Sequence, residues 1–153
     1  MNNNFTSHNL IAKNEAETIK FAQDFANKIL AQSINHLICL SGPMGAGKSV
    51  FARSFIQHVF QDKNMEVPSP TFTLVQQYER ETLTLWHFDL YRLEHAEEIY
   101  EIGWEEATMQ TSYNIALIEW PERIESLLPN PYTHIDIKPL DETQRQITIT
   151  DHK

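Results

Sequence analysis

The run from Gly42 to Ser49 constrains this chain more than any other part of its sequence. It reads Gly-Pro-Met-Gly-Ala-Gly-Lys-Ser and fits the pattern G-x-x-x-x-G-K-[ST] at every position. Glycines let the backbone curl so that successive N–H groups point into one cavity, which then attracts an anion. The chain has 4 glycines, and three of them lie in this run. The pattern therefore predicts a phosphate-binding loop.

The flanking sequence has the form that such a loop needs. His36–Leu40 is a short apolar run that ends near glycine, which is typical of a buried strand. From residue 51 to residue 59, phenylalanine and valine recur every four positions and predict one face of a helix that starts near Gly47. The positive end of that helix would then face the phosphates.

We expect the loop to bind ATP together with Mg²⁺. Lys48 supplies a positive charge for the β- and γ-phosphates, and we expect its head to face solvent or ligand. The hydroxyl of Ser49 is a possible magnesium ligand. The loop residues that we expect to contact the nucleotide are Gly42, Met44, Gly45, Ala46, Gly47, Lys48 and Ser49.

The rest of the chain alternates between helical and extended patterns. Asn14 and Glu17 are spaced as a capping box ahead of a helix of about four turns. We expect strands to begin at Phe72 and to span Leu83–Phe88 and Asn114–Trp120, a turn at Glu79–Glu81, short helical pieces at 97–102 and 105–108, and extended runs at 134–137 and 146–150. These patterns predict one α/β P-loop NTPase-like domain over residues 1–153, with a mixed parallel and antiparallel sheet flanked by helices. We expect residues 1–10 to be flexible.

Composition excludes several classes of protein. No apolar run approaches the roughly 20 residues that span a bilayer, so we expect no membrane association. The single cysteine, Cys39, forbids an internal disulfide and suits the cytoplasm. The formal net charge is −9, with Lys and Arg scattered singly, so direct binding to nucleic acid is disfavoured. A role near RNA would then act through a protein partner.

Two carboxylates that follow apolar strands, Asp89 and Glu119, are candidates for the acidic groups of the site. A phosphate loop needs an acidic residue to hold Mg²⁺ and one to position the attacking water. The sequence does not decide which residue does which, and either one could be an ordinary solvated carboxylate. Thr71 could approach the γ-phosphate as a switch residue, or it could simply open a strand. Trp120 follows Glu119 and lies near the expected nucleotide edge.

Four segments in serial order resemble the TsaE family (formerly YjeE), the bacterial tRNA threonylcarbamoyladenosine biosynthesis ATPases. They are the loop at 42–49, Ser69–Val75, His87–Leu93 and Ile118–Glu122. The phosphate loop is generic, whereas the segments H-F-D-L-Y-R-L and I-E-W-P-E are specific to the resemblance. Ser49 stands where the family usually has threonine, which keeps the hydroxyl. Beyond about Pro129 the chain has no distinctive match.

The resemblance implies that the chain hydrolyses ATP in complex with TsaB and TsaD, and that tRNA is contacted indirectly through this complex. It implies that Ser49 and Glu119 ligate Mg²⁺, with Asp89 the other candidate ligand. Asp89 and Thr71 would lie beside the γ-phosphate, so the candidate catalytic residues are Asp89, Glu119 and Thr71. Glu15 and Thr18 would lie near the adenine, although a plain first helical turn also explains them.

Two other functions use the same loop. A small nucleotide kinase needs a second phosphate-acceptor site and usually arginines in a lid, and the 5 arginines here are scattered. A nucleotide-gated protein-binding switch with incidental hydrolysis would use the same lysine, serine and carboxylates. Arg92 is the arginine best placed to act at the site, but a partner could equally supply one. We therefore expect weak hydrolysis by the chain alone and stronger hydrolysis with partners.

Overall fold

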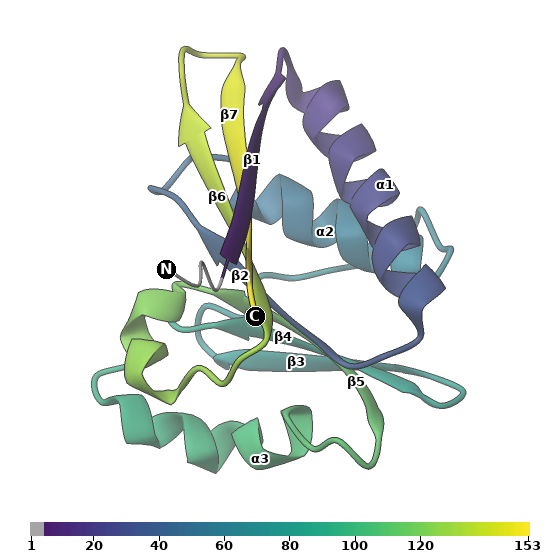
Figure 1. Ribbon diagram of the computed structural model, residues 1–153, viewed down its shortest axis with the longest axis vertical. Coiled ribbons are helices and arrows are strands. Elements are labelled where there is room, and N and C mark those ends of the chain that lie inside the picture. The colour runs from purple at the N-terminus through teal and green to yellow at the C-terminus, as the bar shows by residue number, and fades with distance from the viewer. Residues whose placement is uncertain (1–4) are drawn as a thin grey trace.

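The computed structural model describes residues 5–153 as one sheet with helices on both faces (Figure 1). The strands are β1 (Phe5–Ala12), β2 (His36–Ser41), β3 (Val75–Arg80), β4 (Leu83–Asp89), β5 (Tyr113–Glu119), β6 (Tyr132–Pro139) and β7 (Arg145–His152). The helices are α1 (Glu15–Gln32), α2 (Lys48–Val59) and α3 (Trp104–Ala107), with 3₁₀ segments η1 (Ala96–Ile102) and η2 (Pro121–Leu127).

The seven strands lie in the order β1-β7-β6-β2-β5-β4-β3. The strand before the phosphate loop, β2, lies at the centre and is parallel to both β5 and β6. Strand β4 is parallel to β5, whereas β3–β4, β6–β7 and β1–β7 are antiparallel. This mixed sheet confirms the predicted fold class. It also brings the carboxyl ends of β2, β4 and β5 to one edge, where ligands of α/β sheets bind.

Both faces of the central strands are buried, because helices cover the sheet on each side. Successive side chains of a strand point to opposite faces. Ile38 and Leu40 accordingly pack in the core beneath α1 and α2, while Cys39 packs in a second core with Trp86 and Trp104. Three phenylalanines join α1 to α2, with ring centroids 5.9–6.1 Å apart: Phe25, Phe51 and Phe55.

The predicted cap of α1 is present. The side chain of Asn14 accepts a hydrogen bond from the backbone N–H of Glu17 at 3.0 Å. The carboxylate of Glu17 reaches back to the N–H of Lys13, at 3.4 Å. The helix that follows has 18 residues, which makes it longer than the four turns expected.

Three sequence expectations differ from the structure. Residues 5–10, expected to be flexible, belong to strand β1, whereas residues 1–4 lie outside the described part of the chain. Phe72 does not begin a strand: it lies in a turn that the hydrogen bond from Leu74 N–H to the Pro70 carbonyl closes, and it is 81% exposed. The turn between β3 and β4 is at Glu81-Thr82, because the pairing continues to Arg80.

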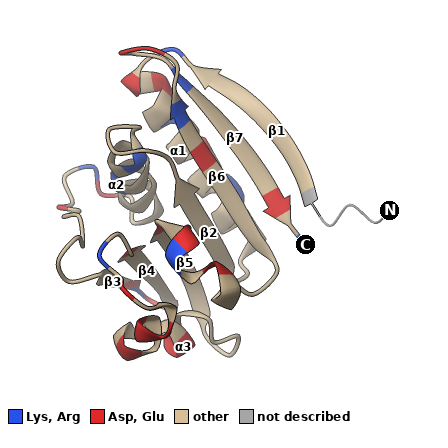
Figure 2. Ribbon diagram, turned by 90° about the vertical axis from the view of Figure 1, so that its left-hand side faces the viewer, with Lys and Arg blue, Asp and Glu red and all other residues tan. Residues whose placement is uncertain are grey.

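Charge is unevenly distributed over the surface. Residues 94–106, which include η1 and most of α3, contain six glutamates and no lysine or arginine. Figure 2 shows this acidic region around α3. Such a surface would repel the phosphate backbone of RNA. Within residues 5–153, no helix is long and apolar enough to cross a membrane.

Candidate nucleotide-binding site

The phosphate loop connects the end of β2 to the first turn of α2, and its conformation requires glycine. Gly42, Gly45 and Gly47 have φ angles of 145°, 80° and 109°, which disfavour other residues. A Cβ atom on Gly42 would lie 2.4 Å from the carbonyl oxygen of Ile137 in β6. Ala46 is fully buried and fixes the loop to the core, whereas Met44 is 74% exposed.

Lys48 lies inside the site rather than in solvent. The side chain is 7% exposed, and its Nζ donates a 2.7 Å hydrogen bond to the carbonyl of Gly42. The same Nζ lies 3.6 Å from the ring centroid of Trp120, a cation–π contact. Burial lowers the pKa of Lys48, and the nearby carboxylates of Glu119, Glu122 and Asp89 act in the opposite direction.

Asp89 and Glu119 lie side by side because they end two adjacent parallel strands in matching register. They are 6% and 4% exposed, respectively. Since side chains alternate between faces, His87 shares their face. His87 Nε2 lies 2.7 Å from Oε2 of Glu119, and an ionised Glu119 accepts this hydrogen bond. The other ring nitrogen, Nδ1, is buried without a hydrogen-bond partner among the described residues.

Asp89 also holds the segment that contains Thr71. Its Oδ2 accepts hydrogen bonds from the hydroxyls of Ser69 and Thr71, each at 3.3 Å. Its Oδ1 accepts from the backbone N–H of Tyr91 at 3.1 Å. The Tyr91 ring in turn packs on Trp120, with centroids 5.0 Å apart. The carboxylate of Asp89 thus links the segment that contains Ser69 and Thr71 to the residues that follow β4, although the two are about 20 positions apart in the sequence.

A pocket of about 200 Å³ flanks the loop on the side of α1. Glu15 and Thr18, expected near the base of the nucleotide, line it together with Ala46 and Gly47. The lining also includes three residues of the β6–β7 hairpin that sequence reasoning missed: Glu142, Thr143 and Arg145.

The structure therefore arranges the predicted residues around Lys48 in two groups. Asp89, Glu119, Thr71 and Trp120 lie by the strand ends, and Glu15 and Thr18 lie across the loop, while Ser49 is exposed on the first turn of α2. The structure adds His87 to these residues, through its contact with Glu119. Its spacing of two from Asp89 was the available signal, because that spacing puts both on one face of β4.

The donor set fits a nucleotide phosphate with Mg²⁺. The glycine conformations give the loop the curled backbone that an anion nest needs, although the N–H of Ala46 already donates a hydrogen bond to the carbonyl of Pro43 at 3.1 Å. Hydroxyl and carboxylate oxygens, such as those of Ser49, Asp89 and Glu119, are the ligands that Mg²⁺ prefers. Two carboxylates this deeply buried are costly unless cations or donors compensate them. Lys48 does so in part.

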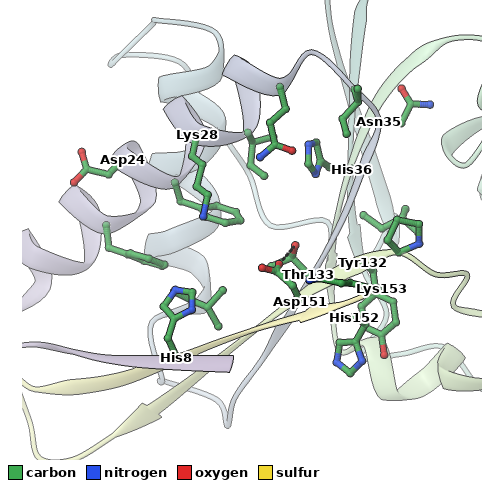
Figure 3. Close-up of a pocket in the computed structure, with 18 of the residues that line it drawn as sticks. His8, Asp24, Lys28, Asn35, His36, Tyr132, Thr133, Asp151, His152 and Lys153 are labelled. Atoms are coloured by element: carbon green, nitrogen blue, oxygen red, sulfur yellow. Dashed lines mark hydrogen bonds between the residues drawn. The ribbon is translucent and has the colours of Figure 1, made fainter. Parts of the chain in front are cut away.

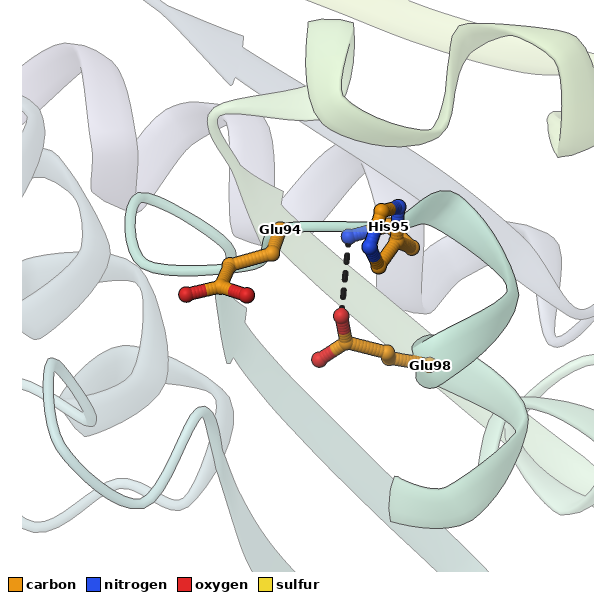
Figure 4. Close-up of side chains that lie close together, drawn as sticks. All are labelled: Glu94, His95 and Glu98. Carbon is orange, nitrogen blue, oxygen red and sulfur yellow. Dashed lines mark hydrogen bonds between the residues drawn. The ribbon is translucent and has the colours of Figure 1, made fainter.

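Two other features lie apart from this site. A cavity of about 440 Å³ lies between α1 and the ends of β1, β6 and β7 (Figure 3). It adjoins His36 and Leu37, at the start of β2, whereas the loop follows the end of that strand. Glu94, His95 and Glu98 gather at the start of η1 (Figure 4), where Oε1 of Glu98 accepts a 2.9 Å hydrogen bond from the N–H of His95. That group caps a 3₁₀ segment.

The strand, glycine loop and helix at the centre of this mixed sheet define a P-loop NTPase-like fold. The crystal structure of Bacillus subtilis YdiB has a TM-score of 0.72 and 25% identity to this chain, and the match covers 97% of this chain and 88% of the other. The sequence model of the family described as "Threonylcarbamoyl adenosine biosynthesis protein TsaE" matches residues 12–147. The chain belongs to the TsaE family.

Individual relatives agree with the family match. A Rickettsia felis protein is 45% identical over 142 residues, which is 92% of this chain and 78% of the relative. A Bacillus subtilis protein is 34% identical over 114 residues, covering 74% and 68%. Both are named tRNA threonylcarbamoyladenosine biosynthesis protein TsaE. The resemblance seen in the sequence is confirmed, and the family takes part in tRNA threonylcarbamoyladenosine biosynthesis.

Proposed function

We propose that this chain is an ATPase that binds ATP with Mg²⁺ on the loop at 42–49 and supports a TsaB–TsaD complex during threonylcarbamoylation of tRNA. The reaction would take place in the cytoplasm, with tRNA contacted through the complex. One observation supports the proposal above all others. In a member of the TsaE family, the ammonium of Lys48 at the end of a glycine loop lies close enough to interact with the buried carboxylates of Asp89 and Glu119, which end adjacent strands.

Phosphate binding would begin with an exchange of partners at Lys48. Its ammonium now interacts with the Gly42 carbonyl and the Trp120 ring. Both are weaker partners for a cation than phosphate oxygens. We propose that Lys48 turns to the β- and γ-phosphates while the loop amides hold their other oxygens. Trp120, displaced from Lys48, would then cover the phosphates or move toward the surface.

The two carboxylates would have different roles, with Glu119 binding Mg²⁺ and Asp89 orienting the attacking water. Ser49 and Glu119 would hold Mg²⁺, and His87 would orient Glu119 through their 2.7 Å contact. When bound, Mg²⁺ neutralises phosphate charge and polarises the transferred group. Asp89, already bonded to Thr71, would orient a water for attack on the γ-phosphorus, so that the bond to the β-phosphate breaks and ADP leaves.

The test measures ADP formation from Mg–ATP without any acceptor, for the chain alone and with TsaB and TsaD. We expect slow turnover alone and faster turnover with both partners. Glu119→Gln should bind nucleotide yet lose hydrolysis by roughly 100-fold or more, while Glu105→Gln, an exposed carboxylate on α3, should behave as the wild type. A calorimetric titration run in parallel separates binding from turnover.

Each alternative outcome has a defined meaning. Equal turnover with and without the partners would contradict partner activation. A strict need for a nucleoside acceptor would identify a kinase. Tight binding with no turnover under any condition would identify a nucleotide-gated switch. Unchanged turnover in Glu119→Gln would assign the magnesium role to Asp89.

A further inference from the structure

A loop that turns its N–H groups toward a ligand leaves backbone carbonyls on its outer side, and these carbonyls need hydrogen-bond donors. The N–H and C=O groups of one peptide unit point in opposite directions, so inward amides leave outward carbonyls. Those carbonyls require donors, because unpaired backbone groups are costly wherever water is partly excluded. In this chain the outer side of the loop faces the β6–β7 hairpin, and the donor is Arg145.

Arg145 begins β7 and contacts the loop from about 100 residues away in sequence. Its Nε donates a 2.8 Å hydrogen bond to the carbonyl of Ala46, and its Nη2 lies 3.4 Å from the carbonyl of Gly45. These two carbonyls belong to the stretch between the glycines that set the loop's shape. The planar guanidinium can hold both at once, which a lysine ammonium cannot do with the same geometry.

The guanidinium is itself fixed in place. Its Nη1 donates to the carbonyls of Asp141 and Gln144, each at 2.9 Å. The carboxylate of Asp141 accepts hydrogen bonds from the backbone N–H groups of Thr143 and Gln144, and these bonds lower the pKa of Asp141. The hairpin turn therefore holds Arg145 before any ligand arrives, so little side-chain entropy is lost when the loop is braced.

Arg145 forms no salt bridge within residues 5–153, although the carboxylate of Asp141 lies close enough to interact with its charge. All its hydrogen bonds go to carbonyl oxygens, and no carboxylate within residues 5–153 comes within salt-bridge distance of it. A cation held behind the phosphate loop adds to the positive potential that attracts an anion, and the carboxylate of Asp141 offsets part of it. The same residue also lines the pocket shared with Glu15 and Thr18, so the hairpin touches both parts of the site.

We propose that Arg145 is a positioning residue, which holds the phosphate loop in its phosphate-receiving shape through the carbonyls of Gly45 and Ala46. This proposal rests on the proposed nucleotide binding of the loop. It assigns a role in the site to the β6–β7 hairpin, a region in which the sequence shows no motif.

The test compares Arg145→Gln and Arg145→Lys with a matched control, Arg53→Gln. Arg53 is exposed on α2 and makes no side-chain hydrogen bond or ion pair within residues 5–153, so Arg53→Gln removes the same charge without touching the loop. Two quantities are measured on the full chain. One is amide hydrogen exchange of residues 43–49 without nucleotide, and the other is the Kd for ADP and for adenosine.

We expect Arg145→Gln to speed exchange of the loop amides and to weaken ADP binding on the order of tenfold. Adenosine, which lacks phosphates, should lose clearly less affinity than ADP, because Arg145 only lines the pocket expected for the base but holds the phosphate loop directly. A merely structural role would weaken both ligands equally. Arg145→Lys should show nearly the same increase in loop exchange and loss of ADP affinity, because lysine keeps the positive charge but cannot donate to both carbonyls with the geometry of a guanidinium. It also tests the proposal if Arg145→Gln does not fold.

Several results would overturn the proposal. One is loop exchange in Arg145→Gln that equals that of Arg53→Gln. Another is an equal loss of ADP affinity in Arg145→Gln and Arg53→Gln, which would show that the loss comes from the removed charge and not from the loop contacts. If the wild type bound no nucleotide, the proposed function would fall, and the exchange measurement alone would then decide whether Arg145 braces the loop.

Discussion

Replacement of Gly42 by alanine tests the geometry of the phosphate loop most directly. At φ 145° an alanine is strained, at a cost of about 1–3 kcal/mol. Its Cβ would also lie 2.4 Å from the Ile137 carbonyl and 3.2 Å from Cβ of Ala46. Because the first of these atoms is backbone of β6, the loop or the strand must shift, which costs roughly 1–3 kcal/mol more. We expect Gly42→Ala to lose about 2–6 kcal/mol of unfolding free energy.

Gly45 provides the matched control in the same loop. Its φ of 80° is also positive, but a Cβ there would meet no atom of the described chain within 4 Å. Gly45→Ala should therefore cost only the conformational strain, about 1 kcal/mol. Urea denaturation followed by circular dichroism gives both free energies, and calorimetry with Mg–ADP shows whether binding falls with them. Equal losses in the two variants would refute the reasoning, because only Gly42 faces a backbone atom.

Three further predictions concern buried and half-buried groups. Lys48→Ala should weaken ATP binding about 100-fold or more while leaving adenosine binding unchanged; titration calorimetry with both ligands checks this, and an equal loss for adenosine would contradict it. Burial raises the pKa of the Cys39 thiol to about 12, so iodoacetamide at pH 8 should label the protein only in urea, as mass spectrometry would show. Rapid labelling of the native chain would contradict its burial. Burial also lowers the pKa of His36 and His134 below the ordinary 6.5. The unfolded chain then binds more protons below about pH 6.5, so stability should be level above that pH and fall as the pH drops toward the folded-state pKa values. Urea midpoints at pH 7.5, 6.0 and 5.0 test the sign, and a His36→Gln, His134→Gln double variant should flatten the curve.

The central elements could be predicted because their signals are local. Residues 37–40 are apolar on both faces, and apolar residues recur every four positions over 51–59, so the apolar pattern alone identifies the strand and the helix. The positions of Asp89 and Glu119 could be predicted for a related reason. Each ends an apolar strand, and the carboxyl ends of parallel strands meet at one edge.

Other features depend on contacts between distant segments, which the sequence does not display. Strand β1 lies at an edge with most of its side chains exposed, so it has no apolar alternation and looked like a flexible end. Trp120 has a positive φ of 60°, which no local pattern predicts, and its ring contacts Lys48, a residue 72 positions earlier in the chain. Arg145 contacts the loop only because β7 lies beside β6 in the finished sheet.

The order of strands has a consequence for synthesis. In the sheet, β1 pairs with β7 alone, although these are the first and last of the described strands to leave the ribosome. The edge of the sheet therefore stays open until residues 145–152 have emerged, and Arg145 arrives with them. A nascent chain that stops short of this point would have the glycine loop without its brace. Nucleotide capture during translation should consequently come late, after nearly all of the domain has been made.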